Sequence, residues 1–440
     1  MSYKSKNLRA FASSRETQKE EATPALVPKL RFPGFDKPWS NDPLAKTLKE
    51  HKIKNTAGRD VFSVSMEYGI VNQIALLGRS FAAADTSRYT IGRRFDVVYT
   101  KSPLKAFPFG IVKQCKFDGE VALSPLYGVL TPPNQHVGLM IEAYFESPNR
   151  SKDFLAPLCQ KGAKNTLQIT NTTFLSGRLP LPTQPAEQQK IAECLSSVDE
   201  LMAAQARKVD ALKTHKKGLM QQLFPREGET QPRLRFPEFQ NAGEWEEVPL
   251  GKIAEIKLGK MLDKQKHTTG HLLPYLNNMS VRWNDVNTSD LPKMYFNDRE
   301  LDRFGLEAGD VVVCEGGEPG RAAVWDGRLP DLKFQKAIHR VRFNVPFEPK
   351  ILVLHLENLA GTDQFEMLFT GGGIKHLTGE TFSRLKIPLI PHAEQQRIAD
   401  CLTSLDDLIT AHTQKLEALK THKKGLMQQL FPSPEEQNTL

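Results

Sequence analysis

The sequence predicts an α+β fold in which two mixed α/β units are each followed by a long helix, and the two helices pack on each other. The main observation is a repeat, because residues 186–225 return at 393–432, 207 residues later, with 28 of 40 positions identical and no gap. The last fifteen residues of the two copies, 211–225 and 418–432, are identical. A repeat at so long a spacing indicates two similar structural units and a pseudo-two-fold chain.

Each copy of the repeat predicts one long helix. No proline lies between Ile191 and Leu223, and a Phe-Pro pair stops the pattern in both copies. Apolar residues recur at alternating spacings of four and three, which is typical of a coiled-coil seam. Gln205 and His412, then Lys216 and Lys423, interrupt the seam at equivalent places, and such polar positions fix register. The predicted helix–helix seam consists of Ile191, Leu195, Val198, Met202, Val209, Leu212, Leu219, Ile398, Leu402, Leu405, Ile409, Leu416, Leu419 and Leu426.

A second, shorter repeat opens each globular unit. Leu30 to Phe35, with Trp39, matches Leu234 to Phe239, with Trp245. The units themselves have diverged, and both read as mixed α/β with candidate strands at 96–99, 111–113, 121–123, 310–313 and 338–343. The predicted order is a flexible tail at 1–28, a first domain at 29–185, helix one at 186–225, a second domain at 226–392, helix two at 393–432 and a tail at 433–440.

Composition describes an ordinary soluble protein with an excess of positive charge. The 440 residues are 39% hydrophobic and 25% charged, with a formal net charge of +8, which permits a polyanionic partner. Five cysteines without CxxC spacing argue against a disulfide framework or a zinc site and favour a reducing cytoplasm. No apolar run is long enough for a membrane span, so we expect a cytoplasmic protein without membrane contact.

Motifs for common catalytic chemistry are missing from the sequence. We find no GxxxxGK[ST] phosphate loop, no GxGxxG after a strand, no HExxH, no GxSxG and no methyltransferase Asn/Asp-Pro-Pro-Tyr motif. The sequence therefore predicts a binding protein with no catalytic residue and no metal site.

The combination of these features resembles the specificity subunit of type I restriction–modification systems. The residues that carry the resemblance are the Glu-Gln-Gln-x-Ile-Ala starts of the two helices, each shortly after a proline. In the first domain, Asp118 to Tyr127 is similar to the family's Gly-x-Val-Ser-Pro-x-Tyr strand, although Ala-Leu is inserted before Ser-Pro. In the second, Gly309 to Arg321 and Gln335 to Arg340 are similar to further family stretches.

The resemblance implies two target-recognition domains separated by an antiparallel coiled coil. Each domain would read one half of a bipartite, asymmetric site in double-stranded DNA, and the helices would set the spacing. The chain would have no cofactor of its own. Two modification (methyltransferase) subunits would carry S-adenosylmethionine, and restriction (translocase/endonuclease) subunits would use ATP and Mg. The identical segments 211–225 and 418–432 would dock the two modification subunits.

Candidate DNA contacts are basic, amide and aromatic residues, because arginine and lysine pair with guanine and asparagine with adenine in the major groove. For each, a solvated charge or a structural hydrogen bond stays an alternative. The candidates are Arg93, Arg94, Lys101, Lys105, Lys113, Ser124 and Tyr127 in the first domain, and Lys260, Asn277, Asn278, Arg282, Arg321, Lys336, His339, Arg340 and Lys375 in the second.

Two other functions remain open at the level of sequence. A stand-alone sequence-specific DNA-binding regulator predicts tight DNA binding without partners. A coiled-coil scaffold that does not bind DNA predicts no salt-dependent affinity. The basic row in the identical helix ends has two readings of its own, contact with DNA phosphates or a solvated helix face; it comprises Lys213, His215, Lys216 and Lys217 with Lys420, His422, Lys423 and Lys424.

Overall fold

The computed structural model describes residues 27–161, 167–226, 228–262 and 269–432, so both predicted tails lie almost wholly outside the described residues. The chain forms two compact units. Unit 1 holds the residues up to Ala204 together with those from Leu416 onward, and unit 2 holds Gln205–Lys415. Each unit thus contains one globular domain and part of each long helix.

Unit 1 is built on two four-stranded sheets. One has the order β2-β9-β6-β7 and is antiparallel, while the other, β4-β3-β8-β5, contains one parallel pair, β3 with β8. A separate pair, β1 with β12, joins the two ends of the domain. The strands are β1 (Ser40–Pro43), β2 (Lys49–Glu50), β3 (Val61–Ser65), β4 (Gly69–Asn72), β5 (Thr90–Arg93), β6 (Val97–Thr100), β7 (Ile111–Gln114), β8 (Glu120–Leu123), β9 (Gly128–Thr131), β10 (Gln160–Lys161), β11 (Leu167–Gln168) and β12 (Arg178–Leu181), and the short helices are α1 (Gln73–Leu77), α2 (Gln135–Phe145), α3 (Pro148–Leu155) and α4 (Asn171–Ser176).

Unit 2 repeats this plan with different residues. Its four-stranded sheet has the order β14-β22-β19-β20, its second sheet the order β18-β15-β21, and β13 pairs with β23. The strands are β13 (Glu246–Pro249), β14 (Ala254–Leu258), β15 (His271–Leu276), β16 (Val281–Arg282), β17 (Asp285–Val286), β18 (Lys293–Phe296), β19 (Val311–Cys314), β20 (Ala322–Val324), β21 (Lys333–Phe334), β22 (Ile338–Phe343) and β23 (Lys386–Leu389), with helices α6 (Leu250–Ile253), α7 (Asp298–Arg303), α8 (Pro349–Leu359), α9 (Asp363–Glu366) and α10 (Gly379–Arg384).

The two domains therefore share a topology that their sequences hide. β6 pairs with β7 and β9 as β19 pairs with β20 and β22, and the parallel pair β3–β8 corresponds to β15–β21. The five candidate strands predicted from sequence are confirmed as β6, β7, β8, β19 and β22, each to within one or two residues. The predicted α+β fold, with two mixed domains and two long helices, is confirmed.

The long helices are α5 (Pro185–Leu223) and α11 (His392–Leu430), each about 58 Å long at 1.5 Å per residue. They begin one residue before the predicted starts and end just before each Phe-Pro pair. All fourteen predicted seam residues are buried or half-buried, and none is exposed. Exposed positions fall between them, so the covered face of each helix follows the apolar periodicity, while contact of these side chains across a helix–helix seam stays a prediction.

The helices pair in antiparallel fashion within each unit. In unit 1, Asp199 of α5 lies 2.7 Å from the Lys423 ammonium of α11, and in unit 2 the equivalent pair, Lys216 and Asp406, is also 2.7 Å apart. Also in unit 2, the Gln205 amide donates to the main-chain oxygen of His412 at 2.8 Å. Residue numbers rise along one helix as they fall along the other, so the pairing is antiparallel. Gln205 and His412 are repeat equivalents.

The short repeat at the start of each domain closes the unit onto both helices. The Arg31 guanidinium binds the Glu187 carboxylate at the start of α5, and the Leu30 amide donates to the Gln429 carbonyl near the end of α11. Unit 2 repeats both contacts, through Arg235 with Glu394 and Leu234 with Gln222. A carboxylate in the first turn of a helix is also stabilised by the helix dipole.

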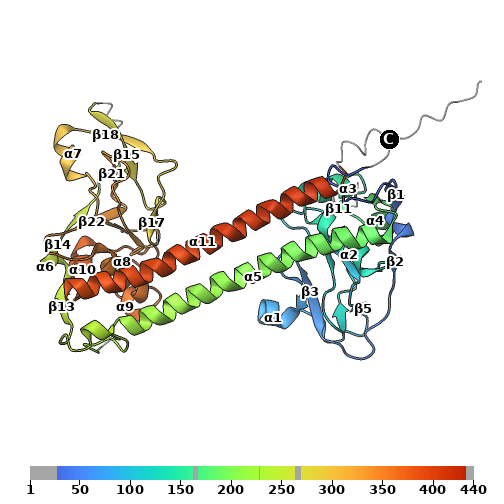
Figure 1. Cartoon of the computed structure of the whole chain (residues 1–440), viewed down its shortest axis with the longest axis horizontal. Coiled ribbons are helices and arrows are strands. Elements are labelled where there is room, and N and C mark those ends of the chain that lie inside the picture. Colours follow the sequence, from blue (N-terminus) through green and yellow to red (C-terminus); the bar gives the residue numbers. More distant parts are fainter. Residues whose placement is uncertain (1–26, 162–166, 227, 263–268, 433–440) are drawn as a thin grey trace, which may run out of the picture. The chain divides into compact units, whose positions relative to one another are not determined.

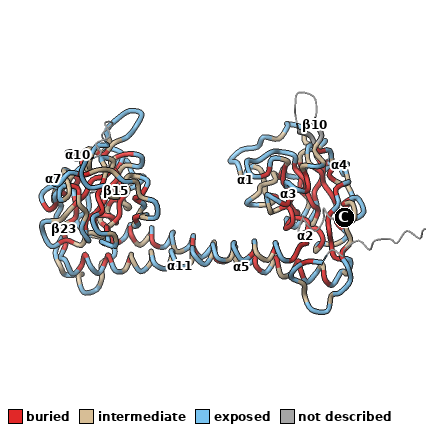
Figure 2. The backbone as a smooth tube through the Cα atoms, turned by 90° about the horizontal axis from the view of Figure 1, so that it is seen from above, coloured by how far each residue is buried: buried red, intermediate tan, exposed pale blue. Residues whose placement is uncertain are grey.

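Each unit has an apolar core that includes the helices. In unit 1, Trp39, Phe174 and Phe431 share a cluster with Leu195, and in Figure 1 the red end of α11 lies beside α3. Figure 2 shows buried residues gathered inside the strand-bearing part of each unit. Within the described residues, none of the helices has the length and apolar character needed to cross a membrane.

Candidate nucleic-acid interface

Five segments of unit 2 meet at one edge of its sheets, which we call the unit 2 edge: residues 259–261, 276–280, 315–321, 334–337 and 370–377. The Lys336 amide donates to the Lys260 carbonyl at 2.8 Å, and the Gln335 amide donates to Leu276 at 3.0 Å. The Asn278 side chain approaches Gly316, and His376 bridges to the same glycine. Segments far apart in sequence thus form one connected surface. The structure brings six predicted DNA contacts together there: Lys260, Asn277, Asn278, Arg321, Lys336 and Lys375.

Two glycines allow the loops of this edge to pack closely. Gly317 has φ +85°, and a Cβ atom on it would lie 2.3 Å from the Asn278 amide nitrogen. Gly320 has φ +86°, and its Cβ would lie 2.3 Å from the Phe365 ring. Side-chain-bearing residues rarely adopt such backbone angles. These glycines therefore hold Arg321 and Asn278 at one place on the edge.

Most cations of the unit 2 edge already have a protein partner. The Arg321 guanidinium donates to the Asn278 carbonyl at 2.6 Å and pairs with Glu318. Lys260 lies 2.5 Å from Glu300, and Lys375 pairs with Glu366. The Lys375–Glu366 pair is exposed and such a pair is worth little, so a phosphate can compete for that lysine, whereas the Arg321 and Lys260 side chains are largely covered. Lys336, by contrast, is exposed and has no ion-pair partner among the residues that the structure describes.

Three predicted contacts lie inside the fold. His339 is buried and bonds the Leu377 carbonyl at 2.7 Å, and burial lowers the pKa of its imidazole. Arg340 is buried and donates to Gly305 and Glu255. Lys113 in unit 1 is buried between Glu142 and Glu146. The geometry favours a structural role for these three, and their contact with DNA stays a prediction. Arg282 is exposed in the β16–β17 hairpin, which directly follows the 276–280 segment of the edge.

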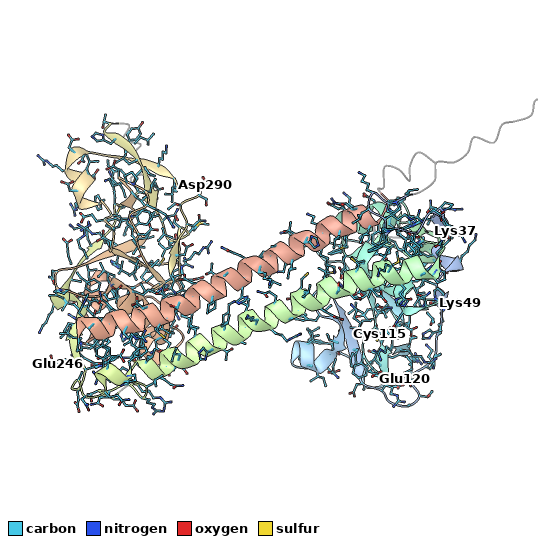
Figure 3. The ribbon with its side chains drawn as sticks, viewed as in Figure 1. Lys37, Lys49, Cys115, Glu120, Glu246 and Asp290 are labelled. Atoms are coloured by element: carbon cyan, nitrogen blue, oxygen red, sulfur yellow. The ribbon has the colours of Figure 1, made fainter. Side chains whose placement is uncertain are left out.

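In unit 1 the predicted contacts fall into two groups at opposite ends of β8. Because Tyr99 pairs with Gly128 and Thr100 ends β6, Lys101 lies next to the Ser124–Tyr127 turn that follows β8. We call this end, with Lys101, Lys105, Ser124 and Tyr127, the unit 1 edge. Arg93 and Arg94 lie at the other end, where they pair with Glu120 and Asp118 at 3.3 Å and 3.1 Å. Figure 3 labels Glu120 at that end. The sequence could not show this separation, because it depends on strand register.

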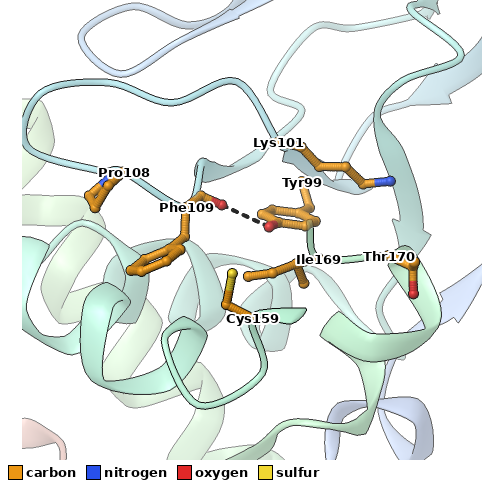
Figure 4. Close-up of a pocket in the computed structure, with 7 residues that line it drawn as sticks. All are labelled: Tyr99, Lys101, Pro108, Phe109, Cys159, Ile169 and Thr170. Carbon is orange, nitrogen blue, oxygen red and sulfur yellow. Dashed lines mark hydrogen bonds between the residues drawn. The ribbon is translucent and has the colours of Figure 1, made fainter. Parts of the chain in front are cut away.

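A cavity of about 290 Å³ opens beside the unit 1 edge and is shown in Figure 4. Its floor is the ring of Tyr99, whose hydroxyl donates to the Phe109 carbonyl at 2.8 Å and whose pKa is raised by burial. Partial burial of Lys101 at the rim lowers the pKa of its ammonium. A partly desolvated ammonium is stabilised by an anionic neighbour, so a phosphate bound at this rim would stabilise the charged form of Lys101. The remaining lining residues are Pro108, Cys159, Ile169 and Thr170.

Both edges also expose large apolar side chains, which were not among the predicted DNA contacts. Tyr68 and Leu126 are 61% and 74% exposed in unit 1, and Met279 and Ile374 are 74% and 72% exposed in unit 2. Each lies at a loop tip next to turn-forming residues, as in Ser-Pro-Leu-Tyr and Gly-Gly-Gly-Ile-Lys. Large apolar side chains at loop tips can contact thymine methyl groups or wedge between base steps. Apolar residues beside turn formers were the signal that would have found them.

Groups of three or more residues able to hold a metal ion are absent from the described parts of the chain. The side chains that the two edges present are cations, amides and the exposed apolar residues of the loop tips. That set of side chains suits a ligand rich in phosphate and flat bases.

Comparisons with known proteins agree with this arrangement. A family model described as the type I restriction modification DNA specificity domain matches residues 242–421. Two curated relatives come from Methanocaldococcus jannaschii. The type I restriction enzyme MjaVIII specificity subunit is 26% identical over 275 residues, 60% of this chain and 63% of its own length. The putative type I restriction enzyme MjaX specificity subunit is 28% identical over 282 residues, 62% of each chain. The match thus spans less than two thirds of either relative.

Solved structures show the same fold over more of the chain. The S subunit of a type I restriction–modification system from M. genitalium aligns with a TM-score of 0.56 at 13% identity, over 92% of this chain and 99% of its own. A chain from the study of complex assembly and conformational transition of the type I R-M system aligns with a TM-score of 0.52 at 15% identity, over 91% and 99%. Residues 242–421 thus match the type I restriction modification DNA specificity domain, and the chain shares the fold of solved type I S subunits.

Proposed function

We propose that this chain is the DNA specificity subunit of a type I restriction–modification enzyme, and that each of its two domains reads one half of a bipartite, asymmetric site. One observation carries the proposal: two domains with diverged surfaces share a topology and sit on copies of the same helix contacts. A shared frame with different loops is what two readers of different half-sites require. The chain acts by binding and carries no catalytic group of its own.

The two edges supply the chemistry for such reading. The exposed cations Lys105 and Lys336, and Lys101 at the rim of the unit 1 cavity, bind phosphates and release counterions, which supplies affinity that falls as salt rises. Asn278 and Arg321, on rigid loops, and the apolar tips Leu126 and Met279 supply contacts that depend on the base. Affinity and specificity therefore arise from different side chains of the same surface.

We further propose that the identical helix ends dock two modification subunits, which carry S-adenosylmethionine, and that restriction subunits using ATP and Mg join that complex. Packing accounts for the buried identities, such as Leu223 and Leu430. Packing within this chain does not account for Lys213, Thr214 and His215, which are exposed and recur as Lys420, Thr421 and His422. Two copies of one partner would meet the same side chains twice. Such a complex acts on DNA in the cytoplasm.

A map of adenine methylation in cells with and without the gene tests the proposal. We expect a split motif, two short half-sites around a fixed unread gap, that disappears with the gene. An unchanged map would contradict it, and DNA binding by the purified chain would then be measured at two salt concentrations. Salt-dependent binding without partners would support a stand-alone regulator, whereas no binding would support a scaffold.

An exchange of domains tests the division of labour. Residues 226–392 are replaced by the corresponding domain of a relative with a different site, and the methylated motif is read again. We expect one half-site to change while the other half-site is kept. A change in both half-sites would show that the domains do not read DNA independently.

A further inference from the structure

A lysine sits in the helix seam of unit 2, where the heptad pattern calls for an apolar residue. Lys216 of α5 is 5% exposed. Its ammonium lies 3.0 Å from the Glu357 carboxylate of α8 and 2.7 Å from the Asp406 carboxylate of α11. One side chain thus joins the recognition domain to both long helices. A buried ammonium is costly unless both its charge and its protons are satisfied, and here they are.

The contacts of Lys216 belong to a closed ring. The Asn284 amide nitrogen donates to Glu357 at 2.9 Å, and the Asn284 amide oxygen accepts from the Lys350 ammonium at 2.8 Å. Lys350 in turn lies 3.3 Å from Asp406, which returns to Lys216. Two lysines and two carboxylates leave the ring with no net charge. Asn284, in the left-handed region at φ +63°, lies in the turn of the β16–β17 hairpin, two residues from the predicted DNA contact Arg282.

Unit 1 has the same device, assembled from different residues. Lys423, the repeat equivalent of Lys216, is 9% exposed and lies 2.5 Å from Glu146, just after α2, and 2.7 Å from Asp199 of α5. Lys113 of β7 binds Glu146 at 3.0 Å and ties the sheet into the same group. Glu357 lies within α8, whereas Glu146 follows the end of α2. Two diverged domains therefore each present a carboxylate to the same lysine from different places.

A group of buried ion pairs fixes the orientation of the domain on the helices, which apolar packing alone does not. Leu352 and Leu356 of α8 share a core with Ile398 and Leu402 of α11, but apolar contact is non-directional and tolerates small rotations. Hydrogen-bonded ion pairs hold only within a narrow range of distance and angle. The ring therefore adds an orientation to a contact whose strength comes from apolar burial.

We propose that Lys216 and Lys423 are positioning residues that fix the tilt of each recognition domain on its helix pair, and so the length of the unread gap between the half-sites. The proposal rests on the proposed function. A domain that tilts on its helices moves its reading edge along the DNA, whereas the bases it reads stay the same because its loops are unchanged. Loss of the lysine thus relaxes the gap without changing either half-site.

The test uses the full chain in complex with its modification subunits. The substrates are DNA duplexes with both half-sites and gaps one and two base pairs shorter or longer than the native gap. For Lys216→Met, which fills the seam with an apolar side chain of similar length, we expect the preference for the native gap to fall by roughly tenfold. Glu357→Gln breaks the link to the domain but keeps that to α11, and it should act in the same direction. Lys216→Arg, which can still bridge two carboxylates, should keep the native preference.

Matched variants separate positioning from folding and from charge. Lys423→Met should relax the gap in the same way from unit 1, and Lys208→Met, at an exposed lysine about two turns away on α5 and outside the proposed docking segment, should leave the gap unchanged. A uniform loss of methylation on all gaps, with the native preference intact, would show that the lysine is merely structural and would overturn the proposal. Failure of the wild-type complex to methylate any duplex would instead overturn the proposed function.

Discussion

Single buried titratable side chains set limits on the conditions in which each unit is stable. His355 of α8 has its ring against Phe224, and burial lowers the pKa of its imidazole to about 4. Glu146 is the opposite case, because burial raises its pKa but Lys113 and Lys423 together lower it below the ordinary value. In both residues the folded pKa is depressed, so their stabilisation is complete above the unfolded pKa and is lost as pH falls.

Unit 2 should therefore lose stability in mild acid through His355. Between its ordinary pKa of 6.5 and about 4, the unfolded chain takes up a proton that the folded one refuses, which costs about 3 kcal/mol by pH 4. His355→Gln removes this dependence. The measurement is the urea midpoint from tryptophan fluorescence at pH 7 and pH 4.5 in a Trp39→Phe background, which leaves Trp245, Trp283 and Trp325, all in unit 2. If the urea midpoint of His355→Gln falls with pH as much as that of the parent chain, His355 is not the source of the acid sensitivity. His215→Gln, at an exposed position, is the control.

Side chains of the unit 2 edge should divide into two kinds when DNA binding is measured. Lys336→Ala removes a phosphate contact, so it should weaken binding to all sequences and reduce the slope of log affinity against log salt by roughly one. Met279→Ala removes an apolar contact and should keep the salt slope while costing roughly 1–3 kcal/mol at one base position. If both variants bind like wild type at every salt concentration, the edge is not the interface.

At the scale of elements, the short segments that open each domain matter as much as the long helices. Glu187 and Glu394, in the first turns of α5 and α11, are both 0% exposed. Each is neutralised by an arginine from the opening segment, Arg31 or Arg235. The side-chain hydrogen bond to Glu394 raises the pKa of the Arg235 guanidinium. The segment thus makes burial of a helix start possible.

Removal of one arginine should damage one unit and spare the other. Arg235→Met leaves Glu394 buried without its partner, which typically costs about 3–5 kcal/mol. We expect faster hydrogen exchange in β13 and β23 of unit 2, whose pairing this contact adjoins, with β1 and β12 unchanged. Arg31→Met should show the reverse. Equal exchange changes in both units would mean that the two closures are not independent.

Local and long-range order differ in how far the sequence reveals them. The helices and their seam follow from periodicity, which is written in adjacent residues, and Gln205, Lys216 and their equivalents were recognisable as polar interruptions. The partners of these polar residues could not be recognised from the sequence, because Glu357 and Asn284 come close to Lys216 only through the tertiary fold. For the same reason Lys113, His339 and Arg340 looked like surface cations, although strand register turns them inward. The shared domain topology was hidden because short strands carry little pattern.

At the scale of the whole molecule, the two units are not equivalent in how the chain builds them. Unit 2 is one continuous stretch, Gln205–Lys415, whereas unit 1 needs the residues from Leu416 onward to complete its core. Met427, Leu430 and Phe431 are buried in that core, and the Arg150 guanidinium donates to the Met427 and Phe431 carbonyls at the end of α11. The last helix is therefore a structural part of the first domain.

A deletion of residues 416–440 should consequently destabilise the first domain more than the second. Unit 2, which contains the second domain, directly precedes the deleted segment in the sequence, and its 211 residues separate that segment from the rest of unit 1. We expect Trp39, the only tryptophan of unit 1, to become exposed to a soluble quencher while Trp245 and Trp325 stay protected. The readout is fluorescence quenching in single-tryptophan chains, with Lys420→Ala, an exposed position in the deleted segment, as the control. Protection of Trp39 in the deleted chain would contradict the expectation.

The closure of unit 1 by the end of α11 also sets an order of events on the ribosome. Residues 205–432 must be synthesised after the first domain has emerged and before its core can close, which takes roughly 10–45 s at 5–20 residues per second. During that interval unit 2, whose parts are contiguous, can already fold. Trp39 and Leu195 meanwhile lack the cover of Phe431. During synthesis, part of the apolar surface of the first domain therefore stays exposed to solvent until the end of α11 is made. We expect this to be the stage at which a chaperone binds the nascent chain.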